Sequence, residues 1–518
     1  MPTYLTPGVY VEEVDTGSKP LSAVGTAVAA FVGFTAKRPT DDPDDPAGLK
    51  PRLVTNWSQF ERLYGGFAPG AMLPHCVYGY FNNGGGLCYI VRVPHEKATG
   101  ERPPLALPSA EKADKPALEL TAAVDDDVEV IIQPGTAGTD EGDAPTFDLI
   151  VLHNGREEER FDGLTLSKGP RFAEAVVTEQ STLIGLKVKA AEKTLIPRMG
   201  AYPIAPSATA PVEVRPSDFE GAEAARTGIR GLVIADEVTM VAVPDLITAA
   251  RKSDGSVDLD MWKSVQTSLI THCEGEANRM AVLDAPPGMD PQKIKEWRSD
   301  TAMYDSKFAA MYYPWIKVAN PAATNGDRNI SVPPSGHMDG IWARNDATRG
   351  VWKAPANEVI LGALDVERKI THGEQSLLNP IGINCIRPFG VRGIRVWGAR
   401  TLASDQSWRY VNVRRLFNMV ETSILQGTQW VVFEPNDHAL WQRVKRTITG
   451  FLLGMWRDGA LFGTTPEEAF YVKCDGETNP PESIDEGKLV VEVGLAPVKP
   501  AEFVIFRVSQ WQGGASVE

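Results

Sequence analysis

The sequence predicts a multidomain chain of mixed α/β and α+β class, with an α/β core, a β-rich insertion domain, a C-terminal α+β domain and extended arms at both termini. Three observations lead to this class. Strand and helix patterns alternate with short connections from Phe219 to Asn320, which is typical of a largely parallel sheet covered on both faces. Short strand patterns recur between Ala117 and Phe161 with Gly/Asp turns between them, which favours a sandwich or barrel. After Arg414 the apolar residues take on a helical period.

With 518 residues, the chain is long enough to bury several cores. Changes in composition mark the expected boundaries. The predicted parts are an N-terminal linker arm at 1–20, the first part of the core at 21–95, an outer β-rich insertion at 96–216, the second part of the core at 217–350, the C-terminal domain at 351–487, and C-terminal strands with a linker arm at 488–518.

The core elements follow from apolar runs and turn residues. The predicted strands are Ala23–Thr35, Leu87–Val93, Val238–Asp245, Arg279–Asp284 and Ala309–Val318, and the predicted helices are Trp57–Tyr64, Met72–Phe81, Trp262–Cys273 and Pro291–Ser299. In the insertion we expect strands at Ala117–Ala123, Val128–Gln133, Thr146–His153 and Glu157–Phe161, and a helix at Arg171–Glu179.

The C-terminal domain combines strands with two amphipathic helices. Strands are predicted at Gly393–Thr401, Trp408–Val413 and Trp430–Phe433, which are rich in β-branched and aromatic residues. The first helix starts near Arg414 and ends at Gly427. The second is predicted to start with Asn436 as its N-cap. Its apolar stripe consists of Leu440, Val444, Ile448, Phe451, Leu452 and Met455.

Strand patterns also lie near both ends of the chain, bracketed by prolines. They are Val9–Val14, Lys488–Val493 and Glu502–Val508. A single short strand cannot bury its own face and needs a sheet to join. Each of these strands either pairs with its own domain or adds to the sheet of a neighbouring chain by β-augmentation.

Composition excludes several classes of function. The net charge of -15 argues against general nucleic-acid binding, which needs a basic surface. No apolar run reaches the length of a membrane span, and Met1–Gly17 lacks the apolar core of a signal peptide, so we expect a cytoplasmic protein. The five cysteines, expected to be reduced and mostly buried, are Cys76, Cys88, Cys273, Cys385 and Cys474.

An enzyme hypothesis depends on two carboxylates. Asp245 and Asp284 stand at the C-terminal ends of predicted parallel strands, where active sites of α/β folds open, and they could act as acid and base or hold a metal. No nucleophile elbow, zinc motif or phosphate-binding loop accompanies them. Ser335–Asp339 contains Ser, His and Asp side by side, but we expect a loop there. The acidic stretch Thr40–Lys50 could bind calcium, although it lacks the spacing of an EF-hand and favours solvated turns.

Several separated segments resemble contractile tail sheath proteins, the family of phage tail sheaths and of the sheaths of phage-tail-like contractile injection systems. The segments are TPGVYVEEV from Thr6, WRYVNVRRL from Trp408, FEPN from Phe433 followed by LWQRV, MWRDGALFGTTPEEAFYVKCD from Met455, and GLAPVKPAEFVIFRV from Gly494. The resemblance covers about the first ninety residues and most of the chain after Ala323, in the family's order.

The resemblance implies a structural subunit that polymerises helically around an inner tube in an extended metastable state and then contracts to drive the tube into a target. It implies no enzyme activity, cofactor, metal, direct nucleic-acid contact or membrane insertion. The partners would be further copies of the chain, the inner tube protein, and baseplate and terminal cap proteins. Assembly would take place in the cytoplasm, and the product could belong to a released particle or virion. The alternative hypothesis is a cytosolic α/β hydrolase with Asp245 and Asp284 as its carboxylate pair.

Two groups of residues would carry assembly. The predicted inter-subunit arm residues are Val9, Tyr10, Val11, Glu12, Phe503, Val504, Ile505 and Phe506. The predicted tube-facing residues are Arg443, Arg446 and Arg457, which share the polar face of the second C-terminal helix.

Overall fold

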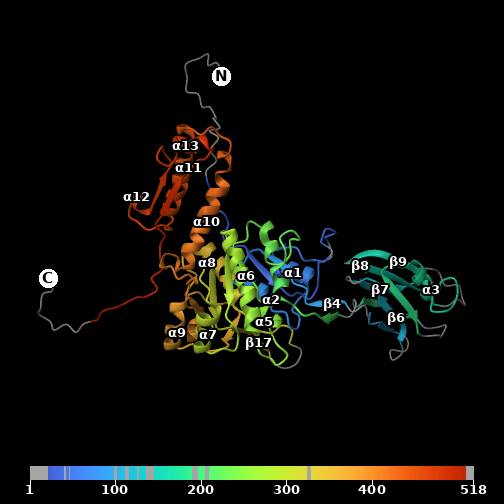
Figure 1. Cartoon of the computed structure of the whole chain (residues 1–518). Helices are drawn as coiled ribbons and strands as arrows, with labels where there is room; N and C mark the ends of the chain where they lie inside the picture. The colour runs from blue at the N-terminus through green and yellow to red at the C-terminus, as the bar shows by residue number, and fades with distance from the viewer. Residues whose placement is uncertain are drawn as a thin grey trace, which may run out of the picture. The chain divides into compact units, whose positions relative to one another are not determined.

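The computed structural model describes residues 21–508 except for 40–41, 46, 99–101, 111–115, 125–127, 136–144, 154, 190–195, 205–208 and 324–327. The chain divides into two compact units (Figure 1). Unit 2 is Pro94–Val214, and unit 1 is the chain on both sides of it. The predicted mixture of helices and strands is confirmed.

Unit 1 is built on an eight-stranded sheet with the order β2-β3-β1-β13-β14-β15-β19-β20. The six inner strands are parallel, and the two edge strands β2 and β20 are antiparallel to their neighbours. The strands β1, β14 and β15 are buried at every residue, which explains their continuous apolar sequences. The bounds are β1 Ala29–Gly33, β2 Arg52–Val54, β3 Cys88–Arg92, β13 Met240–Ala242, β14 Met280–Asp284, β15 Ala309–Tyr313, β19 Ile383–Pro388 and β20 Ile394–Val396.

The helices around this sheet are α1 Trp57–Tyr64, α2 Leu73–Asn82, α4 Pro216–Glu220, α5 Leu246–Ala249, α6 Leu259–Glu276, α7 Pro291–Glu296, α8 Ser335–Arg349 and α9 His372–Leu378. Helices α1, α2, α6, α8 and α9 contact this sheet, and the other helices of this part pack on them. Single helical turns lie at Arg230–Ile234, Trp297–Ala302, Asn379–Ile381 and Gly390–Arg392. All five cysteines are free and buried, as predicted.

The prediction of a loop at Ser335–Asp339 is wrong, because these residues form the buried first turns of α8. Two glycines let α8 lie directly against α2. A Cβ at Gly336 would lie 2.4 Å from the carbonyl oxygen of Cys76, and one at Gly340 would lie 2.5 Å from that of Tyr80. Sequence rules treat such small residues as turn signals, whereas here close packing of two helices requires them.

The single strand predicted at Ala309–Val318 is divided by Pro314. β15 belongs to the main sheet, whereas β16 (Ile316–Ala319) pairs with β17 (Asn329–Val332) and β18 (Ala363–Val366) in a separate small sheet. Proline has no backbone N–H to donate to the ladder, so one strand cannot continue through it.

The C-terminal part of unit 1 contains α10 Val411–Gly427, α11 His438–Arg457, α12 Pro466–Ala469, β21 Phe470–Lys473, α13 Pro481–Asp485 and β22 Glu492–Leu495. Its apolar core joins α10, α11 and β21, and includes Leu416, Val420, Val444, Ile448, Leu452 and Val472. Phe451 of the predicted stripe is only partly buried. The strand predicted at Lys488–Val493 is shifted, since β22 overlaps it at two positions.

Two predicted strands in this part are wrong. Within Trp408–Val413, one helical turn ends at Trp408 and α10 begins at Val411. Val411 and Val413 are buried on the first turn of α10, so their packing outweighs the strand preference of β-branched residues. Trp430–Phe433 contains a helical turn, and Phe433 has φ = 68°, which a β-strand does not allow.

The N-cap of α11 is Asp437 rather than Asn436. The Asp437 carboxylate accepts a hydrogen bond of 2.8 Å from the backbone N–H of Leu440. The Asn436 side chain instead accepts a hydrogen bond of 2.7 Å from Nε1 of Trp441.

Unit 2 is a β-rich domain with its own apolar core. Its two larger sheets have the orders β10-β6-β5 and β11-β7-β8-β9, and β12 pairs with β4. The bounds are β4 Glu96–Ala98, β5 Leu105–Pro108, β6 Pro116–Ala122, β7 Val128–Pro134, β8 Phe147–His153, β9 Arg156–Leu164, α3 Ala173–Gln180, β10 Ile184–Val188, β11 Gly200–Ile204 and β12 Thr209–Pro211.

Candidate functional site

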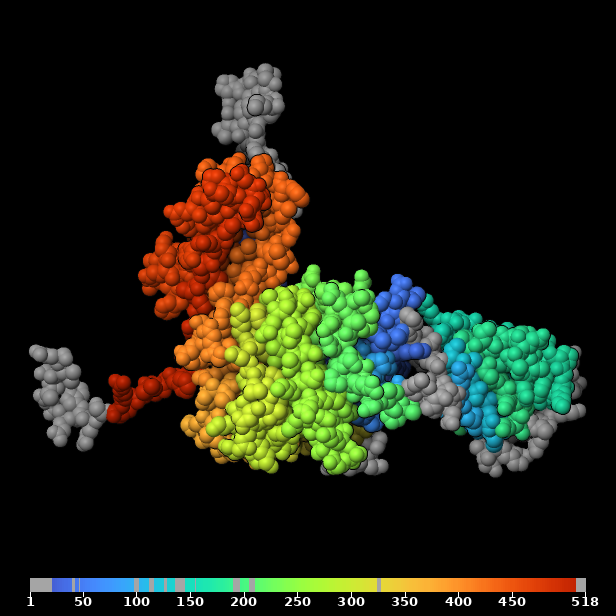
Figure 2. Space-filling view, in the orientation of Figure 1, coloured from blue at the N-terminus to red at the C-terminus, as the bar shows by residue number. Residues whose placement is uncertain are grey.

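The segment that follows Glu502 is an exposed apolar extension of unit 1. The exposed fractions are 72% for Phe503, 67% for Val504, 80% for Ile505, 86% for Phe506 and 95% for Val508. In Figure 2 the last described residues, drawn in red, project from the surface of unit 1 as a thin strip. Its β-branched and aromatic residues are typical of a strand. None of the strands in the described part of the chain pairs with it.

A two-stranded sheet in the C-terminal part has the open edges that such a strand needs. β21 and β22 pair antiparallel, with Phe470 opposite Leu495 and Lys473 opposite Glu492. Phe470 and Val472 point into the core against α11, while Tyr471 on the opposite face is exposed. No third strand joins this two-stranded sheet within the described ranges. The segment around Leu461 pairs with the chain just after β22, at Ala496–Val498, so the edges along β21 and β22 themselves are the parts open to a partner strand.

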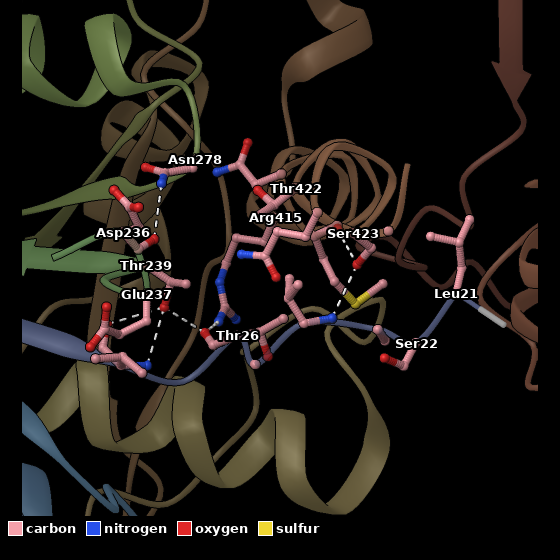
Figure 3. A pocket seen from close by; sticks show the side chains of 18 of the residues that line it. Leu21, Ser22, Thr26, Asp236, Glu237, Thr239, Asn278, Arg415, Thr422 and Ser423 are labelled. Atoms are coloured by element: carbon pink, nitrogen blue, oxygen red, sulfur yellow. Dashed lines mark hydrogen bonds between the residues drawn. The ribbon is translucent and has the colours of Figure 1, made fainter. Parts of the chain in front are cut away.

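The predicted N-terminal arm residues Val9–Glu12 lie outside the described residues. The described chain begins at Leu21 and runs alongside α10 (Figure 3). The backbone N–H of Val24 donates to Oγ of Ser423 at 3.0 Å, and the carbonyl of Thr26 accepts from Arg415 at 2.8 Å. A cavity of about 650 Å³ lies beside this segment, lined also by the loop at Asp236–Thr239 and by Asn278.

The predicted tube-facing arginines lie on the polar face of α11. Arg443 donates to Glu434 at 2.9 Å and lies 5.1 Å above the ring of Trp430, so its charge is partly engaged within the chain. Arg446 and Arg457 are exposed, and Nε of Arg446 donates to the carbonyl of Gln442 at 3.3 Å. The basic face thus exists, and Arg446 and Arg457 are the members most open to a partner.

The two carboxylates of the enzyme hypothesis, Asp245 and Asp284, accept hydrogen bonds at the N-termini of helices. The Asp245 carboxylate accepts hydrogen bonds from the backbone N–H groups of Phe34 at 2.6 Å, Leu73 at 3.2 Å and Met72, which places it at the start of α2. The Asp284 carboxylate accepts from the N–H of Ser335 at 2.9 Å and from its hydroxyl at 2.6 Å, at the start of α8. A carboxylate there satisfies N–H groups that no helical carbonyl reaches and complements the helix dipole.

Burial raises the pKa of both Asp245 and Asp284 to about 7, and their hydrogen-bond donors oppose this rise. Both side chains lie in the interior. Ser335, His337 and Asp339 are all buried on α8, but His337 points to another face of the helix, and the Ser335 hydroxyl donates to Asp284. The arrangement therefore gives the two predicted carboxylates a structural role.

The acidic stretch is stabilised by hydrogen bonds between its own residues. Asp42 accepts from the N–H of Asp44 at 2.9 Å, and Asp45 accepts from those of Leu49 and Lys50 at 3.1 and 2.9 Å. Within the part of the chain that the structure describes, no group of three or more His, Cys, Asp or Glu side chains could hold a metal ion. The helices described there also lack the length and apolar character needed to cross a membrane.

The ion pair at the base of the C-terminal segment was not predicted from the sequence. Arg400 donates to Glu502 at 2.7 Å, although the two residues are 102 positions apart. No local pattern identifies such a pair, because its members meet only in the folded chain.

Two family models match adjacent parts of unit 1. The phage tail sheath protein central domain matches residues 237–402, and the phage tail sheath C-terminal domain matches residues 403–510. Together these ranges cover more than half of the chain. The chain belongs to the contractile tail sheath family. The C-terminal sheath domain contains α10, α11, the two-stranded β21–β22 sheet and the exposed segment after Glu502.

Curated relatives of this sheath chain include phage and prophage proteins. A putative prophage major tail sheath protein of Pseudomonas aeruginosa is 29% identical over 48% of the chain and 64% of the relative. The chain therefore spans slightly less than two thirds of that protein. The tail sheath protein of Burkholderia phage BcepMu is 24% identical over 96% of the chain and 94% of the relative.

Solved sheath structures share the fold along almost the whole chain. One is from the anti-feeding prophage baseplate, with a TM-score of 0.58, 25% identity and coverage of 98% of this chain and 100% of that one. Another is from the PVC sheath complex of an extracellular contractile injection system in the contracted state, with a TM-score of 0.57, 25% identity and coverage of 98% and 99%. The family consists of structural sheath proteins, so the predicted structural role is confirmed at this level, and nothing favours the hydrolase alternative.

Proposed function

We propose that this sheath chain polymerises helically around an inner tube, is held in an extended metastable state, and contracts to drive the tube into a target. The observation that carries the proposal is the exposed apolar segment Phe503–Val508, which has strand composition and no strand partner in its own chain as described. An exposed unpaired strand is an aggregation hazard in a monomer, whereas a protein that polymerises can use it for assembly.

The partner of this segment is the open edge of β21 or β22 in another copy of the chain. Added there as a strand, Phe503 and Ile505 would face one side of the sheet, while Val504 and Phe506 would face the other. The N-terminal residues Val9–Glu12 would join in the same way. Each added backbone hydrogen bond contributes only about 0.5–1.5 kcal/mol net, so the arms hold subunits together through their number in the lattice. Contacts that repeat without closing produce a helical filament.

The remaining partners follow from the family and from the charge of α11. The solved relatives are described as a helical sheath and as parts of a baseplate, which supports the same assembly for this chain. Arg446, Arg457 and, in part, Arg443 would contact acidic groups on the inner tube. We place assembly in the cytoplasm, with a cap at the end away from the baseplate. The family's structural nature also supports a chain without catalytic activity.

Electron microscopy of the purified chain tests the proposal, with wild type expected to form tubes. In a Val504→Pro variant the added strand loses one backbone donor, so tubes should become scarce while the melting temperature of the monomer stays unchanged. A matched variant, Ala501→Pro, places a proline just before the segment and should still form tubes. Discrete globules from wild type would contradict the proposed function. A large fall in monomer melting temperature in Val504→Pro, with tubes retained, would contradict the role of the arm.

A further inference from the structure

We define the C-terminal arm as the segment from Phe503 onward. The residue just before it, Glu502, makes several hydrogen bonds to the folded body of unit 1. Glu502 and Arg400 form a bidentate ion pair. The carboxylate accepts from Nε of Arg400 at 2.9 Å and from a terminal guanidinium nitrogen at 2.7 Å. It also accepts from the amide of Asn379 at 2.8 Å and from the hydroxyl of Tyr410 at 3.0 Å. Three residues from separate segments therefore hold one side chain at the base of the arm.

Arg400 is fixed to the main sheet. It is only 8% exposed. Its backbone N–H donates to the side-chain oxygen of Asn384 on β19 at 2.7 Å, and its carbonyl accepts from the side-chain amide of Asn384 at 2.8 Å. A terminal guanidinium nitrogen of Arg400 also donates to the carbonyl of Asn379 at 3.0 Å. A paired guanidinium and carboxylate with this geometry belongs to the stronger class of polar contacts. Because Arg400 cannot move independently, Glu502 is tied to the core of unit 1.

The chain just before Glu502 is tied to α10. The carbonyl of Val498 accepts a hydrogen bond of 3.1 Å from Asn412 in the first turn of α10, and the N–H of Val498 donates to Ala460 at 3.3 Å. Tyr410, which bonds Glu502, immediately precedes this helix. The base of the C-terminal arm therefore lies at the N-terminal end of α10.

The base of the N-terminal arm lies toward the opposite end of the same helix. The N–H of Val24 donates to Ser423, and a Cβ at Gly427 would lie 1.6 Å from Cδ2 of Leu21, so Leu21 packs directly on the last residue of α10. α10 has 17 residues and is about 25 Å long. One helix thus separates the bases of the two arms by a length that its backbone hydrogen bonds keep constant.

We propose that the Glu502–Arg400 pair is the anchor through which the C-terminal arm transmits tension from a neighbouring subunit to the core, and that α10 holds this anchor at a fixed distance from the base of the N-terminal arm. The inference rests on the proposed function. Without the anchor the residues before Phe503 become free to move, and binding of the arm by a neighbour must then order them as well, which weakens the contact.

Three variants test the anchor. Glu502→Ala removes all of its hydrogen bonds, Glu502→Gln keeps the shape without the charge, and Glu486→Ala removes an exposed carboxylate of the same domain as a control. Hydrogen exchange of the purified monomer reports on residues 496–502, where the N–H groups of Ala496 and Val498 are bonded. The critical concentration for tube formation, measured by pelleting, reports on assembly.

In Glu502→Ala we expect faster exchange at residues 496–502, a modest fall in melting temperature from loss of the ion pair, and a critical concentration raised about tenfold or more, because binding of the arm must then also order residues 496–502. Glu502→Gln should be intermediate, and Glu486→Ala should match wild type. Unchanged exchange, or tubes at the wild-type concentration, would overturn the anchor. If wild type itself forms no tubes, the proposed function fails, and the transmission of tension fails with it.

Discussion

At the scale of single residues, the buried carboxylates of unit 1 differ in whether a helix N-terminus satisfies them. Asp245 and Asp284 each accept hydrogen bonds at the start of a helix. Asp339 is fully buried on α8, and neither of its carboxylate oxygens has a hydrogen-bond partner in the described part of the chain. Burial and the nearby Asp284 raise the pKa of Asp339 well above its ordinary value, and Arg415 opposes this rise. The uncharged form of Asp339 is therefore the one that suits the fold.

Asp339→Asn should become increasingly stabilising relative to wild type as the pH rises from 5 to 8. A carboxyl group whose pKa is raised by folding contributes its stability fully below the unfolded pKa of about 4 and loses it as the pH rises through the folded pKa. The asparagine side chain does not titrate, so the difference should grow by up to about 1.4 kcal/mol per pH unit. Urea unfolding at several pH values measures it.

The exposed substitution Asp458→Asn serves as the control. Asp245 is present in all three proteins, so its titration cancels in the comparison, whereas Asp284 interacts with Asp339 and the two carboxyl groups titrate as a pair. A difference between Asp339→Asn and wild type that does not change with pH would contradict the assignment of a neutral carboxyl group.

At the scale of elements, α11 has one face in the core and another carrying arginines. The apolar face packs on α10 and β21, whereas Arg446 and Arg457 extend into solvent. Arg443 also makes contacts within the chain. It donates a hydrogen bond to Glu434 and lies over the ring of Trp430, both in the turn between α10 and α11. Exposed ion pairs contribute about 0–1 kcal/mol each and weaken with salt, which suits a contact that must release the tube when the sheath widens.

Reversal of the charge on this face should separate folding from tube binding. Arg443→Glu with Arg446→Glu should leave the monomer folded but give sheaths that lack tubes or contract prematurely, as judged by electron microscopy of co-expressed sheath and tube. Arg446→Glu alone leaves the support of Trp430 intact and should show the same defect in weaker form.

The matched control replaces Lys293 and Lys488 by Glu. Both are exposed lysines outside α11, and the change in net charge is the same as in the arginine variant. This control should assemble around tubes like wild type. If the α11 double variant also assembles around tubes and stays extended, at low and high salt alike, this helix is not the tube-facing surface.

At the scale of the whole molecule, the described part of unit 1 makes its first contacts with the C-terminal core at Leu21. Leu21 and Val24 already pack on the C-terminal core, and Thr26 is bonded to Asp346 and Arg415. A segment that precedes these contacts can therefore serve assembly without being needed for folding of the subunit.

Deletion of residues 1–20 should leave a folded monomer and abolish polymerisation. Circular dichroism and the melting temperature should resemble those of wild type, because the buried contacts of unit 1 remain. Sedimentation velocity should show only slow, subunit-sized material under conditions in which wild type forms tubes. Tubes of normal length from the truncated chain would show that the N-terminal arm does not link subunits.

The sequence by itself determined the fold class, the family and most core elements, because these depend on local patterns. The buried strands β1, β14 and β15 are continuous apolar runs, and α6 and α11 carry clear helical periods. The exposed apolar segment near the C-terminus was also visible as a strand without an obvious sheet. Such features need no knowledge of distant residues.

Only the tertiary structure decided the features that depend on distant partners. Ser335–Asp339 has the composition of a turn, yet packing against α2 makes it helical, and Val411 and Val413 have strand preference but are buried on a helix. Asp245 and Asp284 resemble a catalytic pair in the sequence, whereas the helices that meet them make them caps. Glu502 carries no local signal, because Arg400 reaches it only after folding. Local propensity amounts to a few tenths of a kcal/mol per residue, which burial of one large side chain exceeds, so packing decides such positions.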